Sequence, residues 1–195
     1  TLQYAYNNAV IPVRNFIKYK KSRSKSDVTL KNLLGDLEFQ KAELILIVKK
    51  LKKKKLTLAV AESITGGGIG SAITDIAGSS EIFLGGVIAY SDEIKIRELG
   101  ISKNNLKKFT AVSEEVAIAM ADGVRKKFKS DFAISSTGVA GPGKSYGQKA
   151  GTVWIAISSR NNTVAIPLAL TGDRKSIRNA TIESAFATFS RIIGV

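Results

Sequence analysis

Short apolar runs alternate along this chain with longer amphipathic segments. Apolar runs bounded by glycine or polar residues are typical of buried strands, and apolar residues at every third or fourth position are typical of helices. The runs predict strands at 56–62, 81–91, 131–137, 152–159 and 163–170. The amphipathic segments predict helices at 39–55, 67–77, 92–100, 112–129 and 172–193. This alternation predicts a three-layer α/β/α sandwich with a mixed, mostly parallel sheet that ends in a C-terminal hairpin and helix.

Four helix boundaries carry their own sequence signals. Ser113 precedes Glu114 and Glu115, which is the pattern of an N-cap followed by acidic residues in the first turn. Asp173 is the corresponding N-cap candidate for the last helix, and Gly100 is a typical helix stop. The lysines that follow Leu51 suit a helix C-terminus, where cations meet the negative end of the helix dipole.

Glycine-bearing segments follow or interrupt three of the predicted strands. They lie at 63–68, 85–86 and 138–147. Ligands of open α/β sheets collect at the carboxyl ends of strands. If these strands are parallel neighbours, the three segments meet at one edge of the sheet, and we predict the functional site there.

The composition removes several kinds of chemistry. The 195 residues include no cysteine and no histidine, so disulfides, thiolate metal sites and a Ser-His-Asp triad are excluded. The lack of histidine also removes almost every zinc site, so we expect no metal, and acid–base work must use Lys, Asp, Glu or Tyr. The longest apolar runs, such as 44–48, are too short to cross a membrane.

Positive charge is concentrated at the N-terminus. Residues 1–55 hold 14 Lys and Arg against 4 Asp and Glu, whereas residues 56–195 hold 16 against 12. We divide the chain into a basic extension, residues 1–36, either flexible or partly helical, and an α/β/α domain, residues 37–195. A solvated extension is the favoured interpretation of the first segment; a targeting segment or an arm for nucleic acid or an anionic membrane is the alternative.

The stretch AESITGGGIG, residues 61–70, admits two interpretations. Either its glycines cradle a phosphate, or Ser63 is a nucleophile on a strand-to-helix turn, with the N–H groups of 65–67 as oxyanion donors. It lacks both the P-loop pattern and the G-x-S-x-G elbow. A helix N-cap without chemistry remains the alternative for Ser63.

A serine nucleophile without histidine needs another base, and a lysine with a lowered pKa can serve. Lys95 lies among apolar residues after a predicted strand, where desolvation would lower its pKa. The alternative is an ion pair of Lys95 with Asp92 or Glu98. Arg174 at a helix start could clamp a phosphate or carboxylate, or could be an ordinary surface arginine.

The second glycine-rich stretch, SSTGVAGPG at 135–143, follows the predicted strand 131–137. Its N–H groups and the Thr137 hydroxyl could bind an anion, and a mobile surface loop is the alternative.

Six motifs in order resemble one known family. They are AESITGG (61–67), GSSEIFLGGVIAYSDEIK (78–95), AVSEEVAIAMADG (111–123), STGVAGPG (136–143), GTVWIA (151–156) and GDR (172–174). Their order and spacing are similar to those of the C-terminal domain of competence/damage-inducible protein A, a family that includes bacterial nicotinamide-nucleotide amidases. The resemblance covers about residues 40–193.

The resemblance implies hydrolysis of nicotinamide mononucleotide to nicotinate mononucleotide and ammonia, in the bacterial cytoplasm and without a cofactor. It implies that Ser63 is the nucleophile, that Lys95 is the base, and that Tyr90 and Thr137 are further polar residues of the catalytic pocket. Arg174 would bind the substrate phosphate. The accompanying substrate-binding positions are Thr65, Gly66, Gly67, Gly86, Gly138 and Gly141.

Two positions depart from the family pattern. Ile64 stands where many members carry cysteine or a small residue, and Asp92 stands where asparagine is common. A carboxylate at residue 92 would favour the charged form of Lys95.

The alternatives to the amidase are an inactive module of the same fold, which binds a phosphoribosyl ligand or a protein, and nucleic-acid binding through the basic extension. A small-molecule nucleotide is the expected partner. Self-association into a homo-oligomer is left open.

Overall fold

A five-stranded mixed sheet forms the centre of the molecule in the computed structural model, which describes the backbone of residues 30–195 and the side chains of residues 41–195. The strand order is β2-β1-β3-β4-β5. Strand β1 is parallel to both β2 and β3, whereas β4 runs antiparallel to β3 and to β5. The strands are β1 (Leu58–Glu62), β2 (Phe83–Ile88), β3 (Phe132–Gly138), β4 (Thr152–Ser158) and β5 (Thr163–Ala169).

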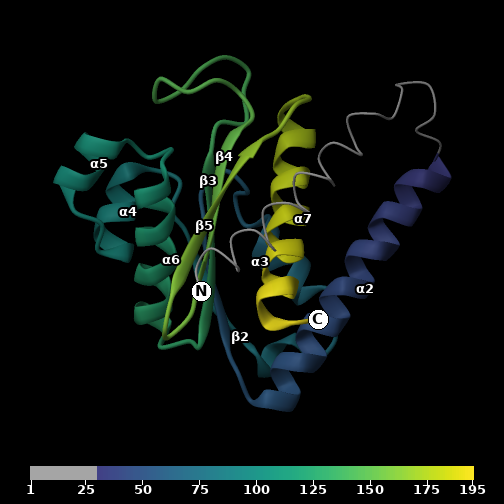
Figure 1. Ribbon diagram of the computed structural model, residues 1–195. Coiled ribbons are helices and arrows are strands. Elements are labelled where there is room, and N and C mark those ends of the chain that lie inside the picture. Colours follow the sequence, from purple (N-terminus) through teal and green to yellow (C-terminus); the bar gives the residue numbers. More distant parts are fainter. Residues whose placement is uncertain (1–29) are drawn as a thin grey trace.

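Helices cover both faces of this sheet, which confirms the predicted three-layer sandwich (Figure 1). One face carries α4, α5 and α6, and the other carries α2, α3 and α7 (Figure 1). The helices are α2 (Leu30–Lys54), α3 (Gly68–Thr74), α4 (Asp92–Leu99), α5 (Lys103–Phe109), α6 (Glu114–Phe128) and α7 (Arg174–Ile193), and a 3₁₀ turn, η1, covers Ser79–Glu81.

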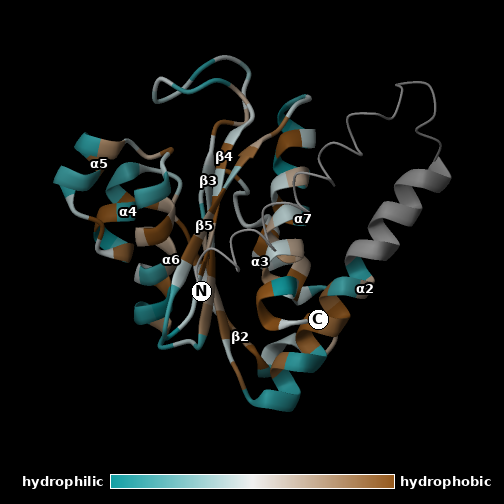
Figure 2. Cartoon of the chain, in the orientation of Figure 1, coloured by the Kyte–Doolittle hydropathy of each residue, from teal (hydrophilic) through white to brown (hydrophobic). Residues whose placement is uncertain are grey.

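The sheet separates two apolar clusters of the core, one on each face. Leu58 and Val60 of β1 pack into the apolar cluster beneath α2, α3 and α7, while Ala59 and Ala61 pack into the cluster beneath α4 and α6. This split follows from the alternation of side chains along a strand. In Figure 2 the strands are mostly apolar, and the lysine-rich end of α2 is hydrophilic.

The predicted helix boundaries hold where a cap was proposed. The hydroxyl of Ser113 accepts a hydrogen bond from Val116 N, and the carboxylate of Asp173 accepts one from Ser176 N. Gly100 ends α4 in the left-handed conformation, with φ of 70°. These contacts satisfy backbone groups that a helix end leaves without partners.

Three element predictions need correction. Helix α5 lies in a segment where no helix was predicted, although Ser102 caps it by accepting a hydrogen bond from Asn105 N. Helix α2 begins at Leu30 rather than at residue 39, so it crosses the predicted boundary between residues 36 and 37. The remaining part of the predicted extension, residues 1–29, lies outside the described residues. The strand predicted at 81–91 is shorter, because η1 occupies its start and α4 follows soon after its end.

Gly85 and Gly86 lie inside β2 and not at the carboxyl edge of the sheet, contrary to the predicted convergence of all three glycine segments. The pairing register of β1 with β2 shifts beside Gly85, which has φ of 119°, so this glycine marks a β-bulge. Gly86 pairs with Val60, and a Cβ on it would lie 2.5 Å from the Val60 carbonyl oxygen. These glycines therefore allow close packing of β2.

Candidate active site

A cavity of about 260 Å³ lies at the carboxyl ends of the parallel strands. Segments that follow β1, β2 and β3 line it, together with the first residue of α7. Its lining includes two cations, Lys144 and Arg174, and no carboxylate among the described residues. The complete lining is Ser63, Ile64, Tyr90, Gly138, Val139, Ala140, Gly141, Pro142, Lys144, Ser145, Tyr146 and Arg174.

Ser63 sits at this cavity on the turn between β1 and α3. It is half-buried, and its N–H donates to the Ser136 carbonyl oxygen on β3 over 2.9 Å. Its own carbonyl accepts a hydrogen bond from Gly66 N at 3.2 Å. Ser63 does not cap α3. The N-cap residue of α3 is Gly67, which has no side chain to accept a capping hydrogen bond.

The carboxylate of Glu62, the last residue of β1, binds the N–H groups at the start of α3. Glu62 was not among the site residues predicted from the sequence. Its carboxylate is 1% exposed and accepts hydrogen bonds from Gly67 N at 2.9 Å, Ile69 N at 3.0 Å and Gly70 N at 2.8 Å. An acidic residue directly before a glycine-rich helix start was the signal that could have identified it. Because Glu62 uses these N–H groups, the start of α3 is not the phosphate cradle considered for this stretch.

Arg174 also belongs to the cavity lining. Its guanidinium donates to the Gly141 carbonyl oxygen and to the Tyr90 hydroxyl, both at 2.9 Å. The side chain thus joins the first turn of α7 to the loops after β2 and β3. Tyr90, Gly138 and Gly141 line the cavity, as Ser63 and Arg174 do, so these five predicted residues come together.

Lys95 does not belong to the cavity lining. The side chain is 1% exposed, and its amine is 3.5 Å from Oδ1 of Asp92. Burial lowers the pKa of Lys95, and the nearby Asp92 carboxylate opposes that shift with a smaller effect. The predicted apolar surroundings and the predicted contact with Asp92 are therefore both present.

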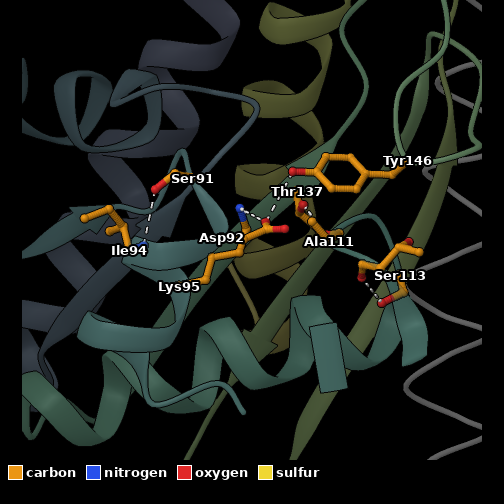
Figure 3. Close-up of polar contacts among 9 residues, drawn as sticks. Ser91, Asp92, Ile94, Lys95, Ala111, Ser113, Thr137 and Tyr146 are labelled. Carbon is orange, nitrogen blue, oxygen red and sulfur yellow. Dashed lines mark hydrogen bonds and ion pairs between the residues drawn. The ribbon is translucent and has the colours of Figure 1, made fainter. Parts of the chain in front are cut away.

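Tyr146 connects Asp92 to the cavity. Its hydroxyl donates to Oδ1 of Asp92 at 3.2 Å, and its ring belongs to the cavity lining. Figure 3 shows the Lys95 amine and the Tyr146 hydroxyl on either side of the Asp92 carboxylate. Burial raises the pKa of Tyr146, and the charge of Asp92 adds to the effect. Sequence reasoning missed this tyrosine because it lies in an irregular loop, far from Asp92 along the chain.

The other predicted positions lie outside the cavity lining. Thr137 is buried, and its hydroxyl donates to the Ala111 carbonyl oxygen at 2.6 Å (Figure 3). Thr65 is buried as well, with its hydroxyl 2.7 Å from that of Ser136. Gly66 and Gly67 have φ of 59° and 96° in the turn after Ser63, and Gly86 lies in β2.

No cluster of three or more potential metal ligands of the His, Cys, Asp or Glu type occurs among the described residues. Within the same residues, no helix is both long and apolar enough to span a membrane.

The fold and the cavity define a class of protein: an α/β/α sandwich with a serine turn and two cations around a cavity at the carboxyl edge of its sheet. The chain belongs to the family of the CinA C-terminal domain, whose model matches residues 41–193. This confirms the resemblance seen in the six motifs.

Relatives and solved structures agree with this assignment. A CinA-like protein of Kosmotoga olearia is 44% identical over 135 residues, covering 69% of this chain and 33% of the relative. A CinA-like protein of Fervidobacterium nodosum is also 44% identical, over 146 residues, covering 74% of this chain and 36% of the relative. The chain thus spans about a third of the length of these relatives.

Two crystal structures match most of their own length. The competence/damage inducible protein of Agrobacterium tumefaciens is 32% identical, with a TM-score of 0.76, covering 80% of this chain and 96% of that structure. A competence or damage-inducible protein from Enterobacter asburiae is 30% identical, with a TM-score of 0.77, covering 80% of this chain and 98% of that structure.

Proposed function

We propose that this chain hydrolyses the carboxamide of nicotinamide mononucleotide, giving nicotinate mononucleotide and ammonia. The observation that carries the proposal is the cavity itself, which holds the Ser63 hydroxyl together with two cations and no carboxylate among its described lining. A substrate with a reactive amide at one end and a phosphate at the other suits such a cavity. A cytoplasmic place in pyridine-nucleotide recycling belongs to the same proposal.

The first half of the reaction forms an ester. The Ser63 oxygen attacks the carboxamide carbon, and its proton passes to the neutral amine of Lys95. Backbone N–H groups of the turn after Ser63 stabilise the negative oxygen of the tetrahedral intermediate. The carbon–nitrogen bond then breaks, the nitrogen takes the proton from Lys95, and ammonia leaves.

The second half of the reaction releases the acid. Lys95 takes a proton from water, the resulting hydroxide attacks the ester carbon, and the bond to Ser63 breaks. The proton on Lys95 returns to the serine oxygen. The carboxylic acid that forms gives its own proton to bulk water, and nicotinate mononucleotide leaves as a carboxylate. The burial of Lys95 supports its role as base, because a lowered pKa leaves more of the amine neutral near neutral pH.

The phosphate end of the substrate suits Arg174 and Lys144. Arginine pairs well with phosphate oxygens through its fork of N–H groups. Arg174 is exposed, and its present partners are a carbonyl and a hydroxyl rather than a carboxylate. Its charge is therefore left for an anion.

Ammonia release from nicotinamide mononucleotide tests the proposal. We expect release by the parent, a loss of at least about 1,000-fold in Ser63→Ala, and a loss of about 100-fold or more in Lys95→Ala. The matched controls are Ser71→Ala in α3 and Lys107→Ala in α5, both at exposed positions, and these should keep parental activity. No ammonia from a well-folded parent would contradict the proposal.

One observation favours a second candidate, a module of the same fold that binds the nucleotide without hydrolysing it: Lys95 does not belong to the cavity lining. For that candidate, calorimetry would detect binding of nicotinamide mononucleotide to the parent and to Ser63→Ala alike, with ammonia formed by neither.

A further inference from the structure

Arg178 reaches from α7 to the backbone directly after Ser63. Its Nε donates to the Ile64 carbonyl oxygen at 3.2 Å, and its Nη2 donates to the Thr65 carbonyl oxygen at 2.7 Å. The guanidinium also lies against Gly66, where an added Cβ would be 3.3 Å from Nη2. One arginine thus holds two consecutive peptide groups of the turn that carries the serine.

This clamp fixes the direction of one N–H group. The carbonyl of Ile64 and the N–H of Thr65 belong to the same peptide, and in a trans peptide the two point in opposite directions. With its carbonyl held by Arg178, this peptide directs the Thr65 N–H away from α7. The side chain of Thr65 is held independently, through its hydroxyl contact with Ser136.

Among the described residues, the N–H groups of Ile64 and Thr65 in this turn donate to no other group, and that of Thr65 belongs to the peptide whose carbonyl Arg178 holds. Of the N–H groups at 65–67, that of Gly66 donates to the Ser63 carbonyl and that of Gly67 to Glu62. The Thr65 N–H donates to no other group among the described residues, although Thr65 is 0% exposed. Buried N–H groups without a partner are rare in proteins, and such a group beside a nucleophile suits a developing oxyanion.

Arg174, one helical turn earlier, contacts different parts of the site. It bonds to Gly141 and Tyr90 of the cavity lining, whereas the hydrogen bonds of Arg178 to the described residues go to the serine turn. Arg178 is also absent from the cavity lining. The two arginines therefore have separable tasks, one toward the bound substrate and one toward the reacting turn.

We propose that Arg178 is a positioning residue that holds the Thr65 N–H as an oxyanion donor for attack by Ser63. This inference rests on the proposed function, because the amidase supplies the reaction in which the oxyanion forms. The experiments below distinguish failure of the proposed function from failure of the role of Arg178. Because Arg178 acts on the transition state and not on the bound substrate, its loss lowers kcat and leaves KM unchanged.

Steady-state ammonia release by Arg178→Met, Arg178→Lys and Arg174→Met tests this division. We expect kcat of Arg178→Met to fall about 100-fold with KM within about two-fold of the parent. Lysine cannot bridge two carbonyls as arginine does, so Arg178→Lys should remain at least about 10-fold below the parent in kcat. Arg174→Met should instead raise KM, and Asn179→Ala, at an exposed position on the same helix, should match the parent. A parental kcat in Arg178→Met, or a change in its KM alone, would overturn the proposal.

Two further measurements separate positioning from folding and from substrate identity. Free guanidinium should restore part of kcat to Arg178→Ala, which a purely structural defect would not allow.

The rate at which a fluorophosphonate labels Ser63, with formation of the oxygen–phosphorus bond and loss of fluoride, should fall in Arg178→Met even if the parent releases no ammonia. In that case the proposed substrate fails and the role of Arg178 stands. Equal labelling of the two proteins, or no labelling of the parent, would overturn the role.

Discussion

Lys95, a buried lysine beside the carboxylate of Asp92, is the most informative residue of this site. Two effects act on Lys95: burial lowers its pKa, and Asp92 at 3.5 Å raises it by less. Asp92 in turn accepts a hydrogen bond from Tyr146. The charge that acts on Lys95 is therefore hydrogen-bonded to Tyr146, a residue of the cavity lining.

Replacing Asp92 tests this balance. In Asp92→Asn the opposing charge is gone, so the pKa of Lys95 falls further below its ordinary value of 10.5. If Lys95 is the base, kcat/KM falls as pH decreases through this pKa, and the acid limb of the profile moves to lower pH in the variant. The pH dependence of ammonia release measures this shift, with Glu93→Gln, at an exposed position beside it, as the control. An unmoved limb would contradict the pairing of Lys95 with Asp92.

Burying Lys95 also has a cost in stability that depends on pH. Between the lowered pKa of the folded state and 10.5, the unfolded chain binds more protons than the folded one, so the free energy of unfolding rises with pH across this window. Lys95→Met removes that cost. We expect the variant to be more stable than the parent at neutral pH, by a margin that shrinks as pH approaches 10.5. Urea unfolding at a series of pH values checks this, and a margin that grows with pH would contradict it.

At the scale of elements, Glu62 and Gly86 stabilise the fold. The sequence pattern alone does not distinguish such structural residues from residues that bind substrate. Glu62 holds the start of α3, and Gly86 lets β2 approach β1. The motif glycines thus include positions that shape the sheet as well as positions in the cavity wall.

Gly86→Ala tests the close approach of β2 to β1. The added Cβ would lie 2.4 Å from Val60 Cγ2 and 2.5 Å from the Val60 carbonyl oxygen, and the backbone atom cannot rotate away. We expect the free energy of unfolding to fall by about 3 kcal/mol. The control is Gly70→Ala in α3, where the nearest atoms lie at 3.5 Å and the helix favours alanine. Chemical denaturation measures both variants, and equal stability of Gly86→Ala and parent would refute the packing role.

The sequence predicted most elements, because their apolar periods and caps are local. Ser113, Gly100 and Asp173 mark helix ends through contacts within a few residues. The contacts of Arg178, Tyr146 and Glu62 were not predicted. Arg178 and Tyr146 reach partners far along the chain, and only the folded sheet brings those segments together. The bulge at Gly85 likewise depends on its pairing with β1.

At the scale of the whole molecule, the parallel half of the sheet decides where chemistry can occur. Strands β2, β1 and β3 end at one edge, so the segments after them share one cavity. The antiparallel hairpin of β4 and β5 extends the sheet beyond β3, at the edge away from β2. The division of the chain at residue 36 stays a prediction. So does the alternative that residues 1–36 bind nucleic acid.

The covalent intermediate gives the most direct test of the central claim that Ser63 is the nucleophile of an amidase. The parent protein, in excess over nicotinamide mononucleotide, would be quenched with acid at a series of times. Intact mass and peptide mapping would then detect any adduct on the protein. We expect a transient acyl adduct on the peptide that contains Ser63, formed as ammonia appears and absent in Ser63→Ala. Ammonia release with no adduct on that peptide, or an adduct that survives in Ser63→Ala, would contradict it.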